Sequence, residues 1–111
     1  YRLLGGSIEF GERSFAAVAR EFVEELGEEI AIKRLFHVFE NIFTYAGQPG
    51  HEIVFVYEAD LLNKAAYSEE SIERIDVSGD DYAVKTAEWV DPFNPPNGLP
   101  LWPDGLVETL K

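Results

Sequence analysis

The sequence predicts a single domain, 1–111, that mixes helix and sheet, either α+β or mixed α/β. Residues 14–26 repeat their apolar side chains with helical spacing. Residues 30–45 and 52–60 are instead rich in β-branched and aromatic residues. A chain of 111 residues, 46% of them hydrophobic, suffices for one core and is too short for two ordinary domains. Helix beside antiparallel-looking strands indicates this class.

The first predicted helix, 14–26, follows a glycine-containing loop at 5–10. Ser14 is the expected N-cap, and Gly27 is the expected helix stop. The spacing i, i+4, i+7, i+11 predicts an apolar stripe made of Phe15, Ala19, Phe22 and Leu26.

Two strands are predicted next, with a break in the first near Lys33 and Arg34. "AGQPG" at 46–50 predicts the turn between them. The second stretch, "HEIVFVYEA", is apolar on both alternating faces, which predicts a central strand covered on both sides. We therefore expect an antiparallel hairpin that pairs 35–45 with 52–60.

The rest of the chain is less periodic. Residues 63–85 are charged and poorly periodic, and we interpret them as a loop or insertion with room for a short strand. "KTAEWV" predicts a strand that ends at Asp91, and "PFNPPNGLP" predicts a proline-rich loop. Residues 103–111 suit a short C-terminal helix.

The composition restricts the classes of partner. The net charge is −12, from 21 acidic against 9 basic residues, which argues against nucleic-acid polymers and anionic membranes as partners. There is no cysteine, which excludes disulfides and thiolate metal sites and fits a cytoplasmic protein. No apolar run reaches about 18 residues, so no membrane span is predicted. An anionic substrate would need a mediating cation.

Three glutamates crowd one face of the predicted helix. With Glu21 set at zero, Glu24 falls at roughly 300° and Glu25 at roughly 40° around the axis. Ala17 lies between them and is small, and Arg20 at the edge is placed to hold one carboxylate. Such a face is either simply solvated or a site for a hard cation, Mg²⁺ or Mn²⁺. Clustered carboxylates raise one another's pKa unless a cation joins them.

The spacing of these residues resembles the Nudix box of the Nudix hydrolases. Gly6 is followed after five residues by Glu12, and after seven more by "REFVEELG", 20–27. The resemblance covers Gly6–Glu28 and departs from the family pattern at one position. Glu28 stands where an aliphatic residue is usual, and we expect Ile30 to take over its packing. Weaker similarity continues in "HEIVFVYEA", "AEWVD" and "LPLWPDGL".

The resemblance implies an α/β/α sandwich with a mixed sheet and a Mg²⁺-dependent pyrophosphohydrolase. Its substrate would be a small molecule, a nucleoside diphosphate linked to another group, cleaved by water attack on phosphorus. Glu24 and Glu25 would bind the metal, and Glu21 would be a further ligand or the general base. The carbonyl of Gly5 or Gly6 would complete the metal shell.

Gly6, Glu12, Arg20 and Gly27 would be structural residues of the box. The alternative to an enzyme is a Nudix-fold module that senses a nucleotide without cleaving it, against which the intact acids argue. The box also comes early in the chain compared with the family, which has strands before it. We therefore expect that this sequence lacks the N-terminal strands of the folded protein, or that another chain supplies those strands.

Several candidates lie outside the box. Asp81 is the first choice for a further acid, ahead of Asp80 and Glu88, because it lies in a predicted glycine-containing loop. Candidate substrate contacts are Arg2, Tyr45 and Trp102. Tyr45 favours a dinucleoside polyphosphate, while Phe43 stands where a proline would suggest ADP-ribose. Oxidised deoxynucleoside triphosphates are a further candidate substrate. A homodimer is a candidate oligomeric state.

Overall fold

The computed structural model describes residues 2–69, 71–78, 81–99, 101–103 and 105–110. They divide into two compact units, which we describe separately. The helix unit comprises Leu4–Lys33 and Ala59–Trp89, and the hairpin unit comprises Tyr1–Leu3, Arg34–Glu58 and Val90–Lys111. Both helices and antiparallel strands are present, which confirms the predicted mixture of helix and sheet. None of the helices in the described part of the chain combines the length and the apolar composition that a membrane-spanning helix needs.

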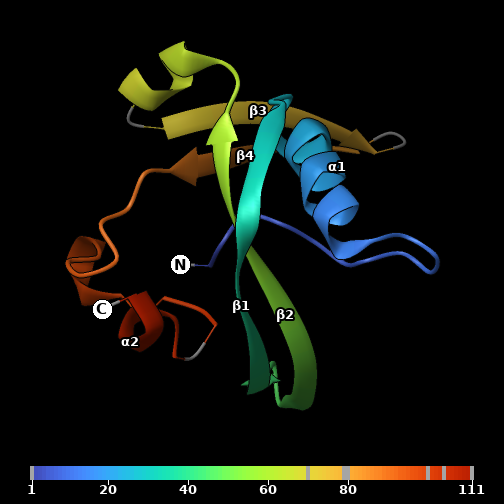
Figure 1. The fold of residues 1–111 in the computed structure, drawn as a ribbon, viewed down its shortest axis with the longest axis vertical. Helices are drawn as coiled ribbons and strands as arrows, with labels where there is room; N and C mark the ends of the chain where they lie inside the picture. Colours follow the sequence, from blue (N-terminus) through green and yellow to red (C-terminus); the bar gives the residue numbers. More distant parts are fainter. Residues whose placement is uncertain (1, 70, 79–80, 100, 104, 111) are drawn as a thin grey trace. The chain divides into compact units, whose positions relative to one another are not determined.

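The helix unit is built on α1, Ser14–Leu26, beside a hairpin of β3, Ser71–Ser78, and β4, Asp81–Glu88. Figure 1 shows α1 next to these two strands, and both contact it. The strands pair antiparallel, from Ser71 opposite Glu88 to Ser78 opposite Asp81. A short 3-10 helix, η1, Lys64–Ser68, precedes β3. The core of this unit takes its buried side chains from α1, the end of β2 and η1: Ala17, Leu26, Leu61 and Ala66.

Helix α1 has the predicted bounds but differs in its cap and its buried face. The N-cap is Arg13, whose side chain makes no capping hydrogen bond, and Ser14 is already helical. Gly27 ends the helix with φ 68°, and its N–H donates to the Val23 carbonyl at 2.9 Å. Phe15, expected in the apolar stripe, is 49% exposed, whereas Ala17 is 2% exposed. Leu26 of the predicted stripe is buried, so the helix buries Ala17 on the side of the acids in addition to part of the stripe.

Strands β1, Ile30–Tyr45, and β2, Gln48–Leu61, form a two-stranded sheet. β1 continues through Lys33 and Arg34 without the predicted break, although the boundary between the two units falls there. The turn is also shorter than predicted. It contains Ala46 and Gly47 with φ of 50° and 78°, the positive values of a type I′ turn.

The prediction that β2 is a central strand covered on both sides is wrong. It pairs only with β1 among the described strands, and Ile53 remains 54% exposed. Apolar residues on both faces of a strand allow it to be buried on both sides. Whether they are buried depends on which other elements pack against the strand.

The prediction of a loop or insertion with a short strand at 63–85 understates the regular structure of this segment. This segment contains η1, β3 and the first part of β4. Main-chain hydrogen bonds can hold a hairpin together even where apolar residues do not alternate along its strands. The charged sequence of this segment therefore did not predict the hairpin. The "KTAEWV" strand ends at Glu88 rather than Asp91.

The C-terminal part of the hairpin unit is short and irregular. It contains η2, Pro96–Gly98, and the predicted helix, here α2, Leu106–Leu110. Leu106 and Phe39 are buried in this unit, and a parallel bridge joins Arg2 to Trp102.

Candidate functional site

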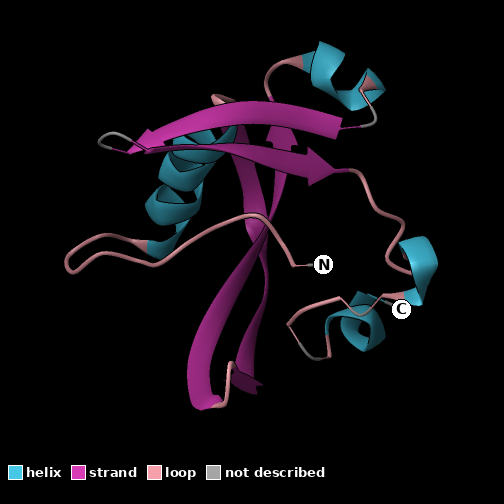
Figure 2. Cartoon of the chain, turned by 180° about the vertical axis from the view of Figure 1, so that it is seen from behind, coloured by secondary structure: helices cyan, strands magenta, loops and turns pink. Residues whose placement is uncertain are grey.

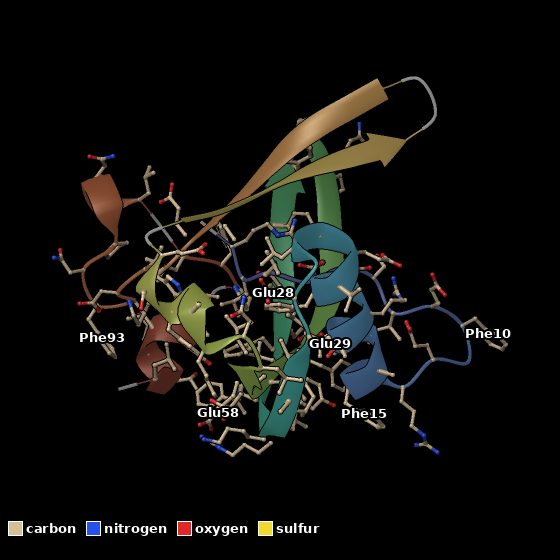
Figure 3. The ribbon with its side chains drawn as sticks, turned by 90° about the horizontal axis from the view of Figure 1, so that it is seen from above. Phe10, Phe15, Glu28, Glu29, Glu58 and Phe93 are labelled. Carbon is tan, nitrogen blue, oxygen red and sulfur yellow. The ribbon has the colours of Figure 1, made fainter. Side chains whose placement is uncertain are left out.

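The loop that leads into α1 folds back on itself at residues 9–12. The Glu12 N–H donates to the Glu9 carbonyl at 3.0 Å, and the Glu9 N–H donates to Glu12 Oε1 at 3.1 Å. Gly11, with φ 82°, permits this turn. Phe10 is exposed at its tip, and Figure 3 shows its ring directed away from α1. The two hydrogen bonds fix the Glu12 carboxylate beside the helix.

Arg20 is the centre of the site. Its Nε and Nη2 donate to the two oxygens of Glu12 at 2.8 and 3.0 Å, which is a bidentate pair. Nη1 donates to Glu21 Oε1 at 2.9 Å and to Glu24 Oε2 at 3.1 Å. The remaining bond runs from Nη2 to the Ser7 carbonyl at 3.1 Å. All the N–H donors of the guanidinium are therefore used.

This network shifts the pKa of two groups. The hydrogen bond from Arg20 lowers the pKa of Glu12, and the main-chain hydrogen bond from Glu9 lowers it further, against a smaller opposing effect of burial. The hydrogen bond to Glu12 also raises the pKa of Arg20, which stays charged. Glu12 and Arg20 therefore form an ion pair at neutral pH that ties the loop to α1.

Gly6 lies directly against the carboxylate of Glu21. A Cβ at position 6 would overlap the side-chain carbon and both oxygens of Glu21. Only glycine allows the main chain to approach a carboxylate this closely. The Glu21 side chain is 14% exposed as a result, whereas that of Glu24 is 57% exposed. Figure 2 shows the loop of residues 4–13 running into α1.

The donor set of this face fits a hard cation in its chemistry. It offers carboxylate oxygens from Glu21, Glu24 and Glu25 on neighbouring turns, with main chain close to Glu21. In the described part of the chain, no three His, Cys, Asp or Glu side chains are gathered as a metal site. The Arg20 Nη1 bridges Glu21 and Glu24 instead. A cation there would take over neutralising charge that the guanidinium now provides.

Glu28, which breaks the box pattern, is only partly buried. Its Oε1 accepts a 3.4 Å hydrogen bond from Asn63, and its N–H donates to the Phe22 carbonyl. Figure 3 shows Glu28 and Glu29 where the chain leaves α1. The polar residue thus has polar partners, and Ile30 is likewise only partly buried.

The candidates outside the box are scattered. Arg2 and Trp102 are joined by their main chains in the hairpin unit, and Tyr45 is exposed at the end of β1. Asp81 is the first residue of β4 and not a loop residue as expected, because β3 and β4 form a hairpin. Its side chain and the whole of Asp80 lie outside what the structure describes. Glu88 ends β4.

Sequence reasoning missed two features. Arg20 was expected to hold one carboxylate and contacts three. Asn41, which was not considered, is buried in β1 and donates from Nδ2 to Glu52 Oε1 at 3.1 Å. The available signal was a polar residue between Phe39 and Phe43 on one face of an aromatic-rich strand.

One of the comparisons with known proteins identifies the family of this chain. No solved structure matches the chain. The family model described as NUDIX domain matches residues 1–103, which includes the loop, α1 and both hairpins. A match over almost the whole chain, with the Gly6, Glu12 and Arg20 contacts in place, leads to one conclusion. The chain belongs to the NUDIX domain family.

Proposed function

We propose that this chain is a divalent-metal-dependent pyrophosphohydrolase. Its substrate would be a nucleoside diphosphate joined to another group through a phosphoanhydride. The family supports a Nudix-type hydrolase in general. The observation that supports the proposal for this chain is the assembled box. Arg20 contacts Glu12, Glu21 and Glu24 together, and Gly6 lies against Glu21.

In this proposal Glu21, Glu24 and Glu25 hold the metal, with the Gly6 carbonyl as a further ligand. Mg²⁺, or Mn²⁺ in its place, would neutralise phosphate charge and lower the pKa of a bound water. A metal of this kind also overcomes the repulsion between an anionic substrate and a chain of net charge −12. Asp81 remains a candidate for an additional acid.

The reaction that we propose is a displacement at phosphorus. A water oxygen forms a bond to phosphorus, and the bond from phosphorus to the bridging anhydride oxygen breaks. The water proton passes to a carboxylate of the box, Glu21 or a neighbour, and the second phosphate leaves with the bridging oxygen. Arg20 would keep Glu21 and Glu24 oriented, because its planar guanidinium fixes both at once.

Phosphate release after phosphatase treatment tests the proposal. The panel contains ADP-ribose, a dinucleoside polyphosphate and an oxidised deoxynucleoside triphosphate, each with Mg²⁺. We expect Glu24→Gln and Glu25→Gln to lower kcat/KM for the cleaved substrate by about a hundredfold or more, because each removes a charged oxygen ligand.

Glu29→Gln is the matched control, since Glu29 is an exposed carboxylate just beyond the helix. Its activity should equal that of the wild type. Unchanged cleavage in both Glu24→Gln and Glu25→Gln would remove the metal assignment. Nucleotide binding without turnover of any substrate would instead make the protein a nucleotide sensor.

A further inference from the structure

The N–H groups of Arg20 differ in how firmly their partners are held. Nε and Nη2 donate to the two oxygens of Glu12, and Nη1 donates to Glu21 at 2.9 Å and to Glu24 at 3.1 Å. The side chains of Glu12 and Glu21 are 17% and 14% exposed, whereas that of Glu24 is 57% exposed. Of the three carboxylates that accept hydrogen bonds from Arg20, Glu24 is therefore the one open to water.

The contact between Arg20 and Glu24 is the easiest of these to break. Water competes for an exposed ion pair and leaves it with a small contribution to stability. The pair with Glu12 is bidentate, and its loss would detach the loop from α1. Glu21 is enclosed by the main chain at Gly6, where a Cβ would overlap its carboxylate. A competitor for these carboxylates would thus take Glu24 from Arg20 and leave Glu12 and Glu21 in place.

The charge of one guanidinium neutralises this cluster only in part. Arg20 faces four carboxylates at distances of 2.8–4.0 Å, those of Glu9, Glu12, Glu21 and Glu24. Carboxylates gathered this closely repel one another, and a further positive charge among them would lower the repulsion. The exposed Glu24 carboxylate, held by a single hydrogen bond from Nη1, is the natural first contact for a cation that arrives from solvent.

We propose that Glu24 exchanges Arg20 Nη1 for a divalent cation, and that this exchange makes the site selective for divalent over monovalent cations. The inference rests on the metal site of the proposed function and adds how that site selects its ion. A guanidinium and a divalent cation on one carboxylate repel each other, so the exposed contact yields. Before the cation binds, Nη1 holds Glu24 in place. Afterwards the cation holds Glu24, and Arg20 keeps Glu12 and Glu21.

The selectivity follows from charge. Na⁺ or K⁺ carries no more charge than the guanidinium that already occupies the contact, so the replacement gains no electrostatic energy and costs the ion part of its hydration. Mg²⁺ carries twice that charge and prefers carboxylate oxygens. Coupling between two partners of one group is reciprocal. If the contact with Nη1 opposes binding of the cation, the cation must also loosen Nη1.

Rotation about the two Cζ–Nη bonds of Arg20 tests the exchange. Each NH₂ group turns only when both of its hydrogen bonds break, and ¹⁵N exchange spectroscopy of the labelled protein measures the two rates separately. The Arg20 resonances are identified by their absence in Arg20→Lys. At saturating Mg²⁺, judged from the heat of binding, we expect Nη1 to turn about threefold faster or more, because one of its two bonds is lost. Nη2, bonded to Glu12 and Ser7, should keep its rate.

Glu24→Gln is the decisive variant. Its amide oxygen can still accept from Nη1 but offers no charge to a cation, so Mg²⁺ should leave the Nη1 rate unchanged. Glu29→Gln, on the exposed carboxylate beyond the helix, should respond as the wild type does. NaCl at the same ionic strength should leave the Nη1 rate of the wild type well below its value in Mg²⁺, which separates the exchange from screening.

Three results would overturn the exchange: an Nη1 rate that Mg²⁺ leaves unchanged, equal acceleration of Nη1 and Nη2, or equal acceleration of Nη1 by NaCl. The outcomes also separate this inference from the proposed function. Cleavage of a member of the substrate panel with an unchanged Nη1 rate would keep the hydrolase and overturn the exchange. Faster Nη1 rotation in Mg²⁺ without cleavage of any substrate would keep the exchange and overturn the hydrolase.

Discussion

The contacts of Arg20 show why this position of the box needs arginine and not lysine. Its five N–H groups point in fixed directions and reach two carboxylate oxygens of Glu12, one of Glu21, one of Glu24 and the Ser7 carbonyl. A lysine carries the same charge but has three donors at one point, so it cannot hold these partners together. The residue therefore acts through geometry as much as through charge.

At the same scale, the Glu12–Arg20 pair predicts a dependence of stability on pH. The pKa of Glu12 is lowered in the folded state from its ordinary value of 4.5. A lowered pKa contributes stability that is fully present above the unfolded value and is lost as the pH falls through the folded value. We expect the urea midpoint of the wild type to fall more steeply than that of Glu12→Gln between about pH 6 and about pH 3.

Glu9→Gln serves as the control for this measurement. The Glu9 carboxylate is exposed and lies 4.0 Å from Arg20 Nη1, so its loss should leave the steep dependence in place. The same slope in the wild type and in Glu12→Gln would show that the ion pair adds nothing to folding.

At the scale of elements, the β1–β2 hairpin depends on its two-residue turn. Ala46 and Gly47 both adopt positive φ, which gives the turn the twist that the strands need. Glycine adopts this conformation without strain, but alanine does so at a cost of about 1 kcal/mol because of its Cβ. Ala46 therefore lowers the stability of the hairpin relative to a residue that tolerates positive φ.

We expect Ala46→Asn to stabilise the protein by about 0.5–1 kcal/mol, because asparagine tolerates positive φ and Asn-Gly is the favoured type I′ sequence. Ala46→Val should destabilise it, because a β-branched side chain fits this conformation poorly. Urea denaturation of the three proteins measures both effects. A lower midpoint for Ala46→Asn would mean that the turn does not have this geometry in solution.

At the scale of the whole molecule, the net charge of −12 dominates. Self-repulsion of this size destabilises the compact state, and salt screens it. The three box glutamates add a local concentration of the same sign on α1, of which Arg20 neutralises only a part.

We expect NaCl to raise the melting temperature through screening, and MgCl₂ at the same ionic strength to raise it further by about 4 °C or more through binding to the folded state. The additional rise should disappear in Glu24→Gln and persist in Glu29→Gln. Differential scanning calorimetry measures both. An equal rise with the two salts in the wild type would argue against a specific cation site.

The sequence by itself determined the local part of this protein. The bounds of α1, the stop at Gly27, the hairpin and the box were all predicted, because helical spacing, turn residues and glycine conformations are properties of neighbouring residues. The family followed from the same residues. Local patterns also suggested which acids share one face of the helix, since 100° per residue fixes that angle.

Only the tertiary structure decided which groups meet. The sequence did not predict that Arg20 contacts three carboxylates, that residues 71–78 pair with 81–88, or that Asn41 is buried with Glu52 beside it. It also predicted a buried β2 and a buried Phe15, which the structure leaves largely open. The physical reason is that burial and strand pairing depend on surfaces contributed by segments distant in the sequence. The local periodicity of apolar residues does not specify which distant segment packs against a given residue.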